Sequence, residues 1–268
     1  MRAQIAVPWA FLVRDLRIEA SHKGALVLRI AAAVVSVLVF YFIATALRGV
    51  GSSSFGPYGG YFGFAVIGLT LLTYMSSGIA AMAGSLRESQ AAGTLELLVI
   101  SPTRLSLTLL SSSLSGFVLA TLSVIVFVAA GAALGVDLGR ADVPVALLSF
   151  AVATVSFAAL ALFAASVVFL TTRGNLVAGG VRTVSVVLCG VFYPVGVLPE
   201  ALRVVAQALP LTHALELARG SLLLGQGVDE LWDELLILGG LGAVLLPASL
   251  LACRVAVRLA RTDGSLTR

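Results

Sequence analysis

Lysine is nearly missing from the sequence: Lys23 is the only one among 17 basic residues. A nucleotide-binding loop of the Gly-Lys-Ser/Thr type needs a lysine that reaches the β- and γ-phosphates. Gly24 and Ala25 follow Lys23, so the sequence holds no such loop. The chain is therefore not expected to be an ATP-hydrolysing enzyme, and any ATP that drives it must bind to another polypeptide.

Charge of either sign is also scarce. Only 11% of the 268 residues are charged, whereas a soluble domain typically carries about 25%. Hydrophobic residues make up 59%, which is more apolar surface than one core of this size can bury. Several uncharged stretches reach the roughly 20 residues that cross the hydrocarbon layer. The surplus apolar surface is therefore expected to face membrane lipid.

Cysteine and histidine are rare, with two of each. Cys189 and Cys253 lie inside apolar segments, where we expect small buried residues and no disulfide framework. So few candidate ligands argue against a metal centre. The basic residues stand singly or in pairs without interleaved aromatic residues, which argues against a nucleic-acid partner.

The apolar runs predict an all-α membrane protein with six transmembrane helices. We expect them at about residues 30–47, 61–86, 105–136, 143–172, from about 183 onward, and 235–253. A loop is expected between the fourth and fifth spans, over residues 173–182. The predicted organisation is an N-terminal cytoplasmic segment, a six-span domain and a short tail, over residues 1–29, 30–260 and 261–268.

The fifth span is expected to be broken, because Pro194 and Pro199 interrupt its apolar run. The segment that follows is only mildly hydrophobic and carries five ionisable side chains: Glu200, Arg203, His213, Glu216 and Arg219. Such a segment must be shielded from lipid by protein or water. We therefore expect a re-entrant segment over about residues 194–219.

His213 and Glu216 stand three residues apart, so they can touch on one face of a helix. A catalytic or proton-relay role is one interpretation of this pair together with Arg219. The other is a structural role at the end of a polar re-entrant helix, which we favour because no second histidine lies nearby.

The N-terminal 29 residues contain an apolar stripe at helical spacing. Trp9 lies on this stripe, whereas Arg14, Asp15 and Arg17 lie off it. Tryptophan with flanking arginines is typical of an amphipathic helix in the membrane interface. A plain cytoplasmic lead-in is the alternative, because a second apolar strip lies on the opposite side.

Arginine and lysine counts orient the chain, because cytoplasmic loops carry an excess of these residues. With six spans, 13 of the 17 basic residues fall on the side of the two termini. Four fall on the other side: Arg48, Arg140, Arg203 and Arg219. Both termini are therefore expected in the cytoplasm.

Residues 87–104 lie on the cytoplasmic side in this topology. Thr94 can cap a short helix that begins at Leu95, and Pro102 disfavours helix at Ser101. The helix would carry several apolar residues at the membrane surface. Such residues indicate a docking surface for a soluble partner.

Two segments resemble one protein family. The first reads Glu88…Gly93-Thr94-Leu95-Glu96-Leu97-Leu98…Ser101-Pro102 and is similar to the coupling-helix segment of ABC-2 type transporter permeases. The second is similar to the family's stretch between spans five and six, and reads Phe192-Tyr193-Pro194…Leu198-Pro199…Leu209-Pro210-Leu211-Thr212-His213-Ala214-Leu215-Glu216, with Arg219. The segments stand in the family's order, and with the N-terminal helix the resemblance covers nearly the whole chain.

This resemblance implies the membrane subunit of a bacterial ABC exporter in the cytoplasmic membrane. It implies pairing with a second permease protomer, identical or different, and with two ATPase subunits that bind ATP and magnesium. Residues 88–101 would dock in a groove of the ATPase, with Arg87, Glu88 and Glu96 as polar contacts, and the N-terminal helix would lie near it. The re-entrant helices would narrow the exit on the outer side.

Two other function classes stay open. An intramembrane lipid-modifying enzyme needs His, Asp or Glu clustered at one membrane face. The acids that come closest lack aligned histidines and look like a solvated loop: Asp229, Glu230, Asp233 and Glu234. An ion-coupled secondary transporter should bury charges within its spans, and the third and fourth spans have none.

The substrate is open among drugs, lipids and lipid-linked glycans. Aromatic residues, which stack on sugar rings, make up only 7% of the chain. This favours an amphipathic or hydrophobic cargo.

Overall fold

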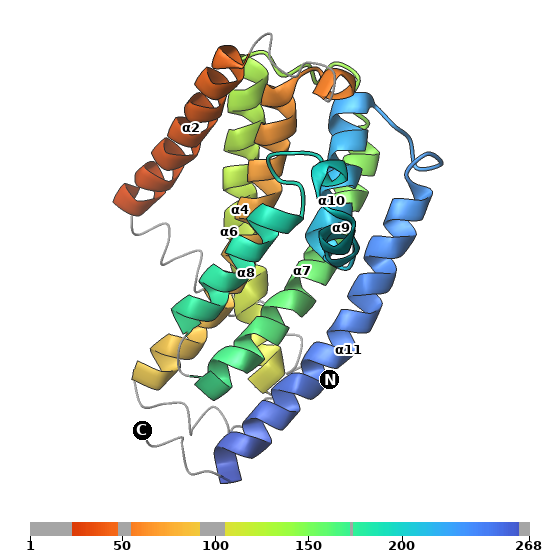
Figure 1. Ribbon diagram of the computed structural model, residues 1–268. Helices are drawn as coiled ribbons and strands as arrows, with labels where there is room; N and C mark the ends of the chain where they lie inside the picture. Colours follow the sequence, from red (N-terminus) through yellow and green to blue (C-terminus); the bar gives the residue numbers. More distant parts are fainter. Residues whose placement is uncertain (1–22, 48–54, 92–104, 172–173, 263–268) are drawn as a thin grey trace.

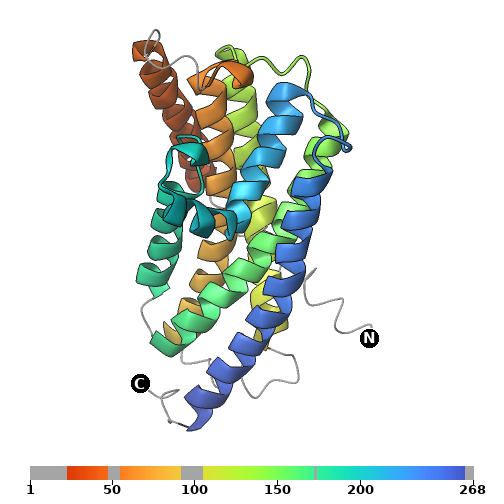
Figure 2. The same cartoon turned by 45° about the vertical axis from the view of Figure 1, so that its right-hand side comes forward.

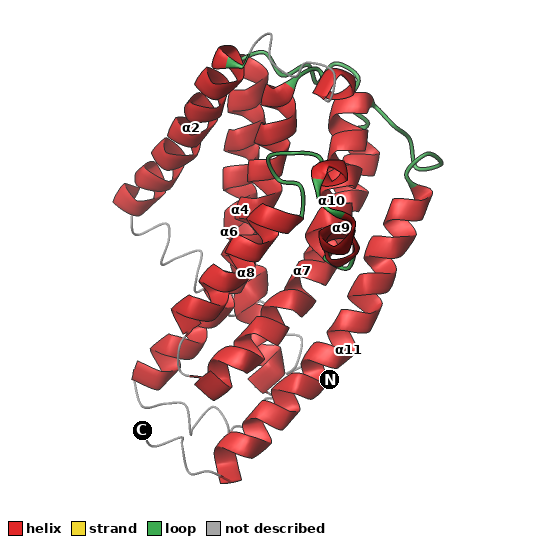
Figure 3. Ribbon diagram, in the orientation of Figure 1, coloured by secondary structure: helices red, strands yellow, loops and turns green. Residues whose placement is uncertain are grey.

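The computed structural model describes residues 23–47, 55–91, 105–171 and 174–262, and all regular elements in this part of the chain are helical (Figure 3). The long helices are α2 (Lys23–Ala46), α4 (Tyr61–Ala91), α6 (Leu105–Ala133), α7 (Val143–Thr171) and α11 (Trp232–Thr262). The short elements are η1 (Gly56–Tyr58), α8 (Gly174–Leu188), η2 (Val195–Val197), α9 (Glu200–Gln207), α10 (Pro210–Arg219) and η3 (Gly220–Leu224), the last being a π-helical turn.

The long helices form a bundle that runs in one general direction (Figure 1). We call the end at which α4 and α7 begin, at the top of Figure 1, the upper end of the bundle. At the lower end α4 and α7 finish and α8 begins. α8 rises only part of the way, α9 lies crosswise, and α10 continues to the upper end (Figure 2).

In the part of the chain that the structure describes, five helices are long and apolar enough to cross a membrane. Their apolar segments are Leu26–Ala46, Tyr61–Ser89, Thr108–Ala133, Val143–Val168 and Trp232–Leu259. These correspond to five of the six spans that the sequence predicts. The predicted fifth span corresponds to α8, whose apolar part is only Val177–Leu188. A helix of 15 residues is about 22 Å long at 1.5 Å per residue, so α8 falls short of the roughly 30 Å of hydrocarbon.

Burial distinguishes the central helix from the peripheral ones. In the most apolar part of α4, 72% of the residues are buried, against 11% in α2 and 22% in α11. α2 exposes large apolar side chains along its length: Val27, Leu28, Val35, Val39 and Phe42 among them. Surface of this kind is compatible with lipid but not with water, so the periphery of the bundle fits a membrane.

The second span is longer than the apolar run predicts. We expected it to end at about Leu86, with Arg87 and Glu88 in the polar segment that follows, but α4 continues to Ala91. Arg, Glu and Gln are good helix formers, and Arg87 Nε donates to the carbonyl of Ala83 at 3.3 Å. Loss of hydrophobicity marks the end of the lipid-facing part of the helix and not the end of the helix.

The loop expected over residues 173–182 is also wrong. α8 begins at Gly174, and Arg182 is an exposed residue inside it. The prediction failed because it treated glycine and arginine as loop residues, although a helix tolerates a glycine at a cost of about 1 kcal/mol.

Candidate functional site

The helical path is interrupted between α8 and η2, over residues 189–194, and we call this interruption the break. A glycine, Gly190, makes it possible. Gly190 has a φ of +73°, in the left-handed region that side chains disfavour. A Cβ there would lie 2.7 Å from Cγ2 of Val195. The break lies against α4 at Gly68, where a Cβ would stand 2.1 Å from the carbonyl oxygen of Val191. Glycine at both positions lets the interrupted chain touch the central helix.

The prolines that we expected to interrupt the fifth span, and Pro210 after them, lie at the starts of the short helices. Pro194 precedes η2, Pro199 is the residue before α9, and Pro210 is the first residue of α10. Proline is well suited to the first turn of a helix, because its missing N–H has no intrahelical partner there. Arg203 on α9 donates to the carbonyls of Gly196 and Leu198 at 2.9 and 3.2 Å. The prolines thus set the path of the chain, and Arg203 holds the turn between η2 and α9.

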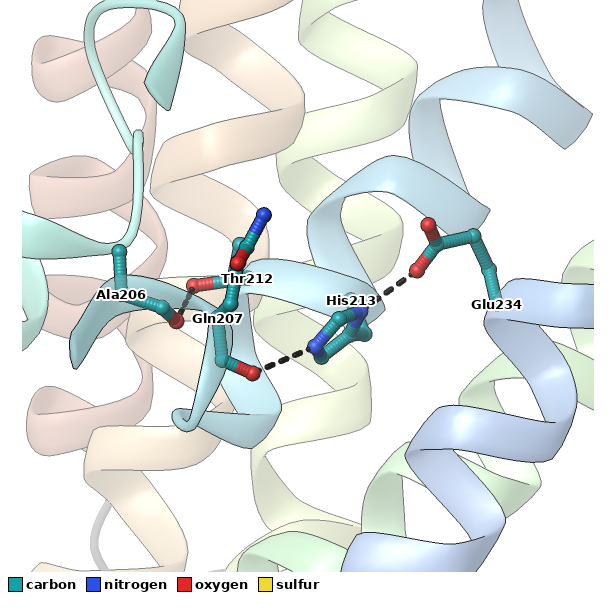
Figure 4. A network of polar contacts seen from close by, with 5 residues as sticks. All are labelled: Ala206, Gln207, Thr212, His213 and Glu234. Atoms are coloured by element: carbon teal, nitrogen blue, oxygen red, sulfur yellow. Dashed lines mark hydrogen bonds and ion pairs between the residues drawn. The ribbon is translucent and has the colours of Figure 1, made fainter. Parts of the chain in front are cut away.

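α10 is enclosed by the bundle although it carries polar residues. Every residue of it is buried except Glu216. Its first turn satisfies the carbonyls at the end of α9: Thr212 Oγ1 donates to Ala206 O at 2.6 Å, and His213 Nε2 lies 2.8 Å from Gln207 O. Figure 4 shows both contacts. The segment over about residues 194–219 thus contains two short helices, α9 and α10, which are joined end to end by these contacts.

Arg219 joins α10 to the break in the chain and to α4. Its Nη2 donates to the carbonyl oxygens of Gly190 and Val191, both at 3.0 Å, and of Phe64 at 3.2 Å. The guanidinium carbon lies 3.4 Å from the centroid of the Phe64 ring, which is a cation–π arrangement. Since Arg219 is only 4% exposed, these contacts replace the water that the guanidinium loses.

His213 joins α10 to α11. Its Nδ1 lies 2.6 Å from Oε2 of Glu234 (Figure 4). The carbonyl of Gln207 can only accept, so Nε2 carries a hydrogen. The short contact on the other side of the ring also needs a hydrogen, either on Nδ1 or on the carboxyl group. His213 and Glu234 therefore share one proton in their short contact, and His213 carries a second proton on Nε2.

Glu234 corrects one interpretation of the sequence. We expected it to belong to a solvated loop of acids without an aligned histidine, but it lies in the first turn of α11 and pairs with His213. Glu216 lies near it, on the helix that carries His213. Among the described residues, no group of three or more His, Cys, Asp and Glu side chains is arranged to hold a metal ion.

Three predicted residues thus lie on α10 and face different neighbours: His213 faces α11, Arg219 faces α4, and Glu216 shares a cavity with Arg219 and Pro194. Sequence reasoning missed Glu234 and Phe64, the partners from distant helices. Of the residues predicted to contact an ATPase, Arg87 and Glu88 form part of the last turns of α4. The others lie outside the described residues: Gly93, Thr94, Leu95, Glu96, Ser101 and Pro102, as do Trp9, Arg14, Asp15 and Arg17.

Comparison with known proteins gives the family. A family model described as ABC-2 type transporter matches residues 9–223, which is well over half of the chain. No curated protein matches it. The match includes the second, third and fourth spans, the break after α8 and the whole of α10. With this match and its apolar helices, the chain belongs to the ABC-2 type transporter family of membrane proteins.

Proposed function

We propose that this chain is the permease subunit of an ATP-driven exporter, and that it forms the path for an amphipathic or hydrophobic substrate such as a drug, a lipid or a lipid-linked glycan. The family match over residues 9–223 carries this proposal. Five apolar helices and a sequence without a nucleotide-binding lysine support it.

The partners in this proposal are two ATPase subunits and a second permease protomer, identical or different. The ATPases would bind ATP and magnesium and would contact the segment 87–104, which begins in the last turns of α4. Glu88 is exposed there, as a contact residue must be. The weakly buried helix α2 leaves apolar surface for lipid or for the second protomer.

The orientation follows from charge. α11 ends at the lower end of the bundle with Arg254 and Arg258 in its last turns. Positive charge concentrates on the cytoplasmic side, which supports a lower end that faces the cytoplasm of a bacterial cell in our proposal. The re-entrant helices α9 and α10 would then narrow the outer exit.

Co-purification tests the proposal. The full chain is expressed with candidate P-loop ATPases from neighbouring genes, and the complex is reconstituted in vesicles. We expect stable co-purification and ATP hydrolysis that rises with one class among drugs, lipids and glycolipids. Failure to bind any ATPase would contradict the proposal.

An ion-coupled secondary transporter is the second candidate, and the partly buried His213–Glu234 pair favours it. Proton-coupled transport would run in vesicles without any ATPase and would stop when the proton gradient is collapsed. ATP-dependent transport that is indifferent to the gradient would exclude it.

A further inference from the structure

A cavity of about 130 Å³ lies beside Arg219, between η1, the start of α4, the break after α8, and α10. The side chains that line it include Tyr58, Phe64, Cys189, Glu216 and Arg219. A single water needs about 10–15 Å³ of such space, so the cavity holds room for a group larger than one water. Its lining combines charged and hydroxyl side chains with apolar ones.

The guanidinium of Arg219 is incompletely satisfied in this cavity. Nη2 donates to three carbonyl oxygens, but the buried Nε has no hydrogen-bond partner among the residues that the structure describes. No carboxylate of the described residues lies within 4.0 Å of Arg219 to form an ion pair with it. A buried charge without a counter-charge is costly, and an ionisable residue at such a place in a membrane protein marks a functional site.

Glu216 lines the same cavity but does not form an ion pair with Arg219, because no carboxylate oxygen of it lies within 4.0 Å of the guanidinium. Its charge acts on Arg219 only at longer range. The nearby Glu234 lies 2.6 Å from His213 and pairs with it. Within the described residues, Arg219 therefore has no acid in direct contact.

We propose that this cavity binds a phosphate-type oxyanion, with Arg219 Nε as a charge-assisted donor and the Tyr58 hydroxyl as a second donor. Guanidinium groups suit phosphate oxygens because their donors are planar and permanently charged. The oxyanion has two possible sources with the same chemistry, a phospholipid headgroup and a soluble phosphate. Binding at this site needs neither ATP nor an ATPase, so the binding test does not depend on the proposed transport function.

The test uses the full chain purified in detergent, with inorganic phosphate and dihexanoyl phosphatidic acid as separate probes. Binding is followed by native mass spectrometry and by the shift in thermal unfolding. Arg219→Lys keeps a positive charge but removes Nε, and we expect it to weaken binding about tenfold. Glu216→Gln removes a nearby negative charge, and we expect it to strengthen binding about threefold.

The control is Arg140→Gln, which removes an exposed arginine of the upper end that does not line the cavity. It should leave the binding of both probes unchanged. Binding of phosphate as well as phosphatidic acid supports a site open to soluble anions, and binding of phosphatidic acid alone supports a headgroup site.

Three results would overturn the proposal: no binding of either probe by the wild type, full binding by Arg219→Lys, or weaker binding by Glu216→Gln, which indicates a cation site. If Arg219→Lys does not fold, Glu216→Gln and Tyr58→Phe decide. The expected result is stronger binding in the first and weaker binding in the second, and any other pattern counts against the oxyanion.

Discussion

At the scale of single residues, His213 holds three helices together. One ring nitrogen lies against the last carbonyl of α9 and the other against Glu234 of α11, while the backbone belongs to α10. Hydrogen bonds that involve charged groups contribute about 1.5–3 kcal/mol each. The position of α10 in the bundle therefore depends strongly on one side chain.

We predict that His213→Ala lowers the free energy of unfolding by about 2–4 kcal/mol, because it removes both contacts and leaves Glu234 without its partner. Thermal unfolding of the purified protein measures the loss. A double-mutant cycle with Glu234→Gln should show a coupling of about 1–2 kcal/mol. Glu200→Gln, which changes an exposed acid of α9, is the control and should have almost no effect. Additive effects of the two substitutions would contradict a stabilising interaction between His213 and Glu234.

The residues of α10 could be predicted from the sequence, but their partners could not. Ionisable side chains in a mildly hydrophobic stretch stand out by composition, which is how His213, Glu216 and Arg219 were found. Glu234 was misread because it follows three other acids in a segment that resembles a solvated loop. Only the fold brings it 2.6 Å from a histidine 21 positions away. Phe64 could not be predicted as a partner of Arg219, because its sequence position is that of an ordinary apolar residue in an apolar helix. Only the fold places the guanidinium over its ring.

Gly68 gives a second prediction at this scale. A Cβ there would meet Val191 O at 2.1 Å and Arg219 Nη2 at 3.0 Å. We expect Gly68→Ala to destabilise the protein by about 1–3 kcal/mol, because the break must move away from α4. Gly84→Ala is the control in the same helix, since a Cβ at Gly84 meets nothing within 4 Å. It should be neutral or stabilise by up to about 1 kcal/mol, as measured by thermal unfolding. Equal effects of Gly68→Ala and Gly84→Ala would refute the close contact between the backbone at Gly68 and Val191.

At the scale of elements, hydrophobicity located the long helices but not their ends. The start of α4 at Tyr61 and of α7 at Val143 agree with the prediction. The latter is marked by Asp142, whose Oδ1 accepts from the backbone N–H of Val145 at 3.1 Å, as a capping residue does. The ends of α4 and α11 and the start of α8 were misplaced, because polar residues continue a helix beyond the lipid as readily as they end it.

The polar end of α4 leads into the segment that we propose to contact the ATPase. We predict that Glu88→Arg combined with Glu96→Arg weakens ATPase binding or uncouples hydrolysis from transport, because two charges of the contact are reversed. Membrane insertion should be unaffected. Co-purification and substrate-stimulated ATP hydrolysis measure the effect. The control reverses two acids beyond η3, with Asp229→Arg and Glu230→Arg, both exposed. Normal assembly and transport in the first double mutant would rule out this contact.

At the scale of the whole molecule, charge and helix direction give one topology. We predict that the upper end faces the outside of the cell. Arg140→Cys should react with a membrane-impermeant maleimide on intact cells, whereas Arg254→Cys should react only after lysis. Both positions are exposed. The background replaces Cys189 and Cys253, which are buried, by alanine. The reverse labelling pattern would invert the topology and the direction proposed for export.

α4 has a mechanical consequence. It is one uninterrupted helix of 31 residues, about 46 Å long. Near its first turns it is fastened to Arg219 through Phe64 and to the chain break through Gly68. In its last turns it carries Arg87 and Glu88. A stiff helix cannot move at its lower end alone. In the topology that we propose, displacement of its cytoplasmic end by an ATPase would therefore be transmitted to the contacts of Arg219 near its upper end.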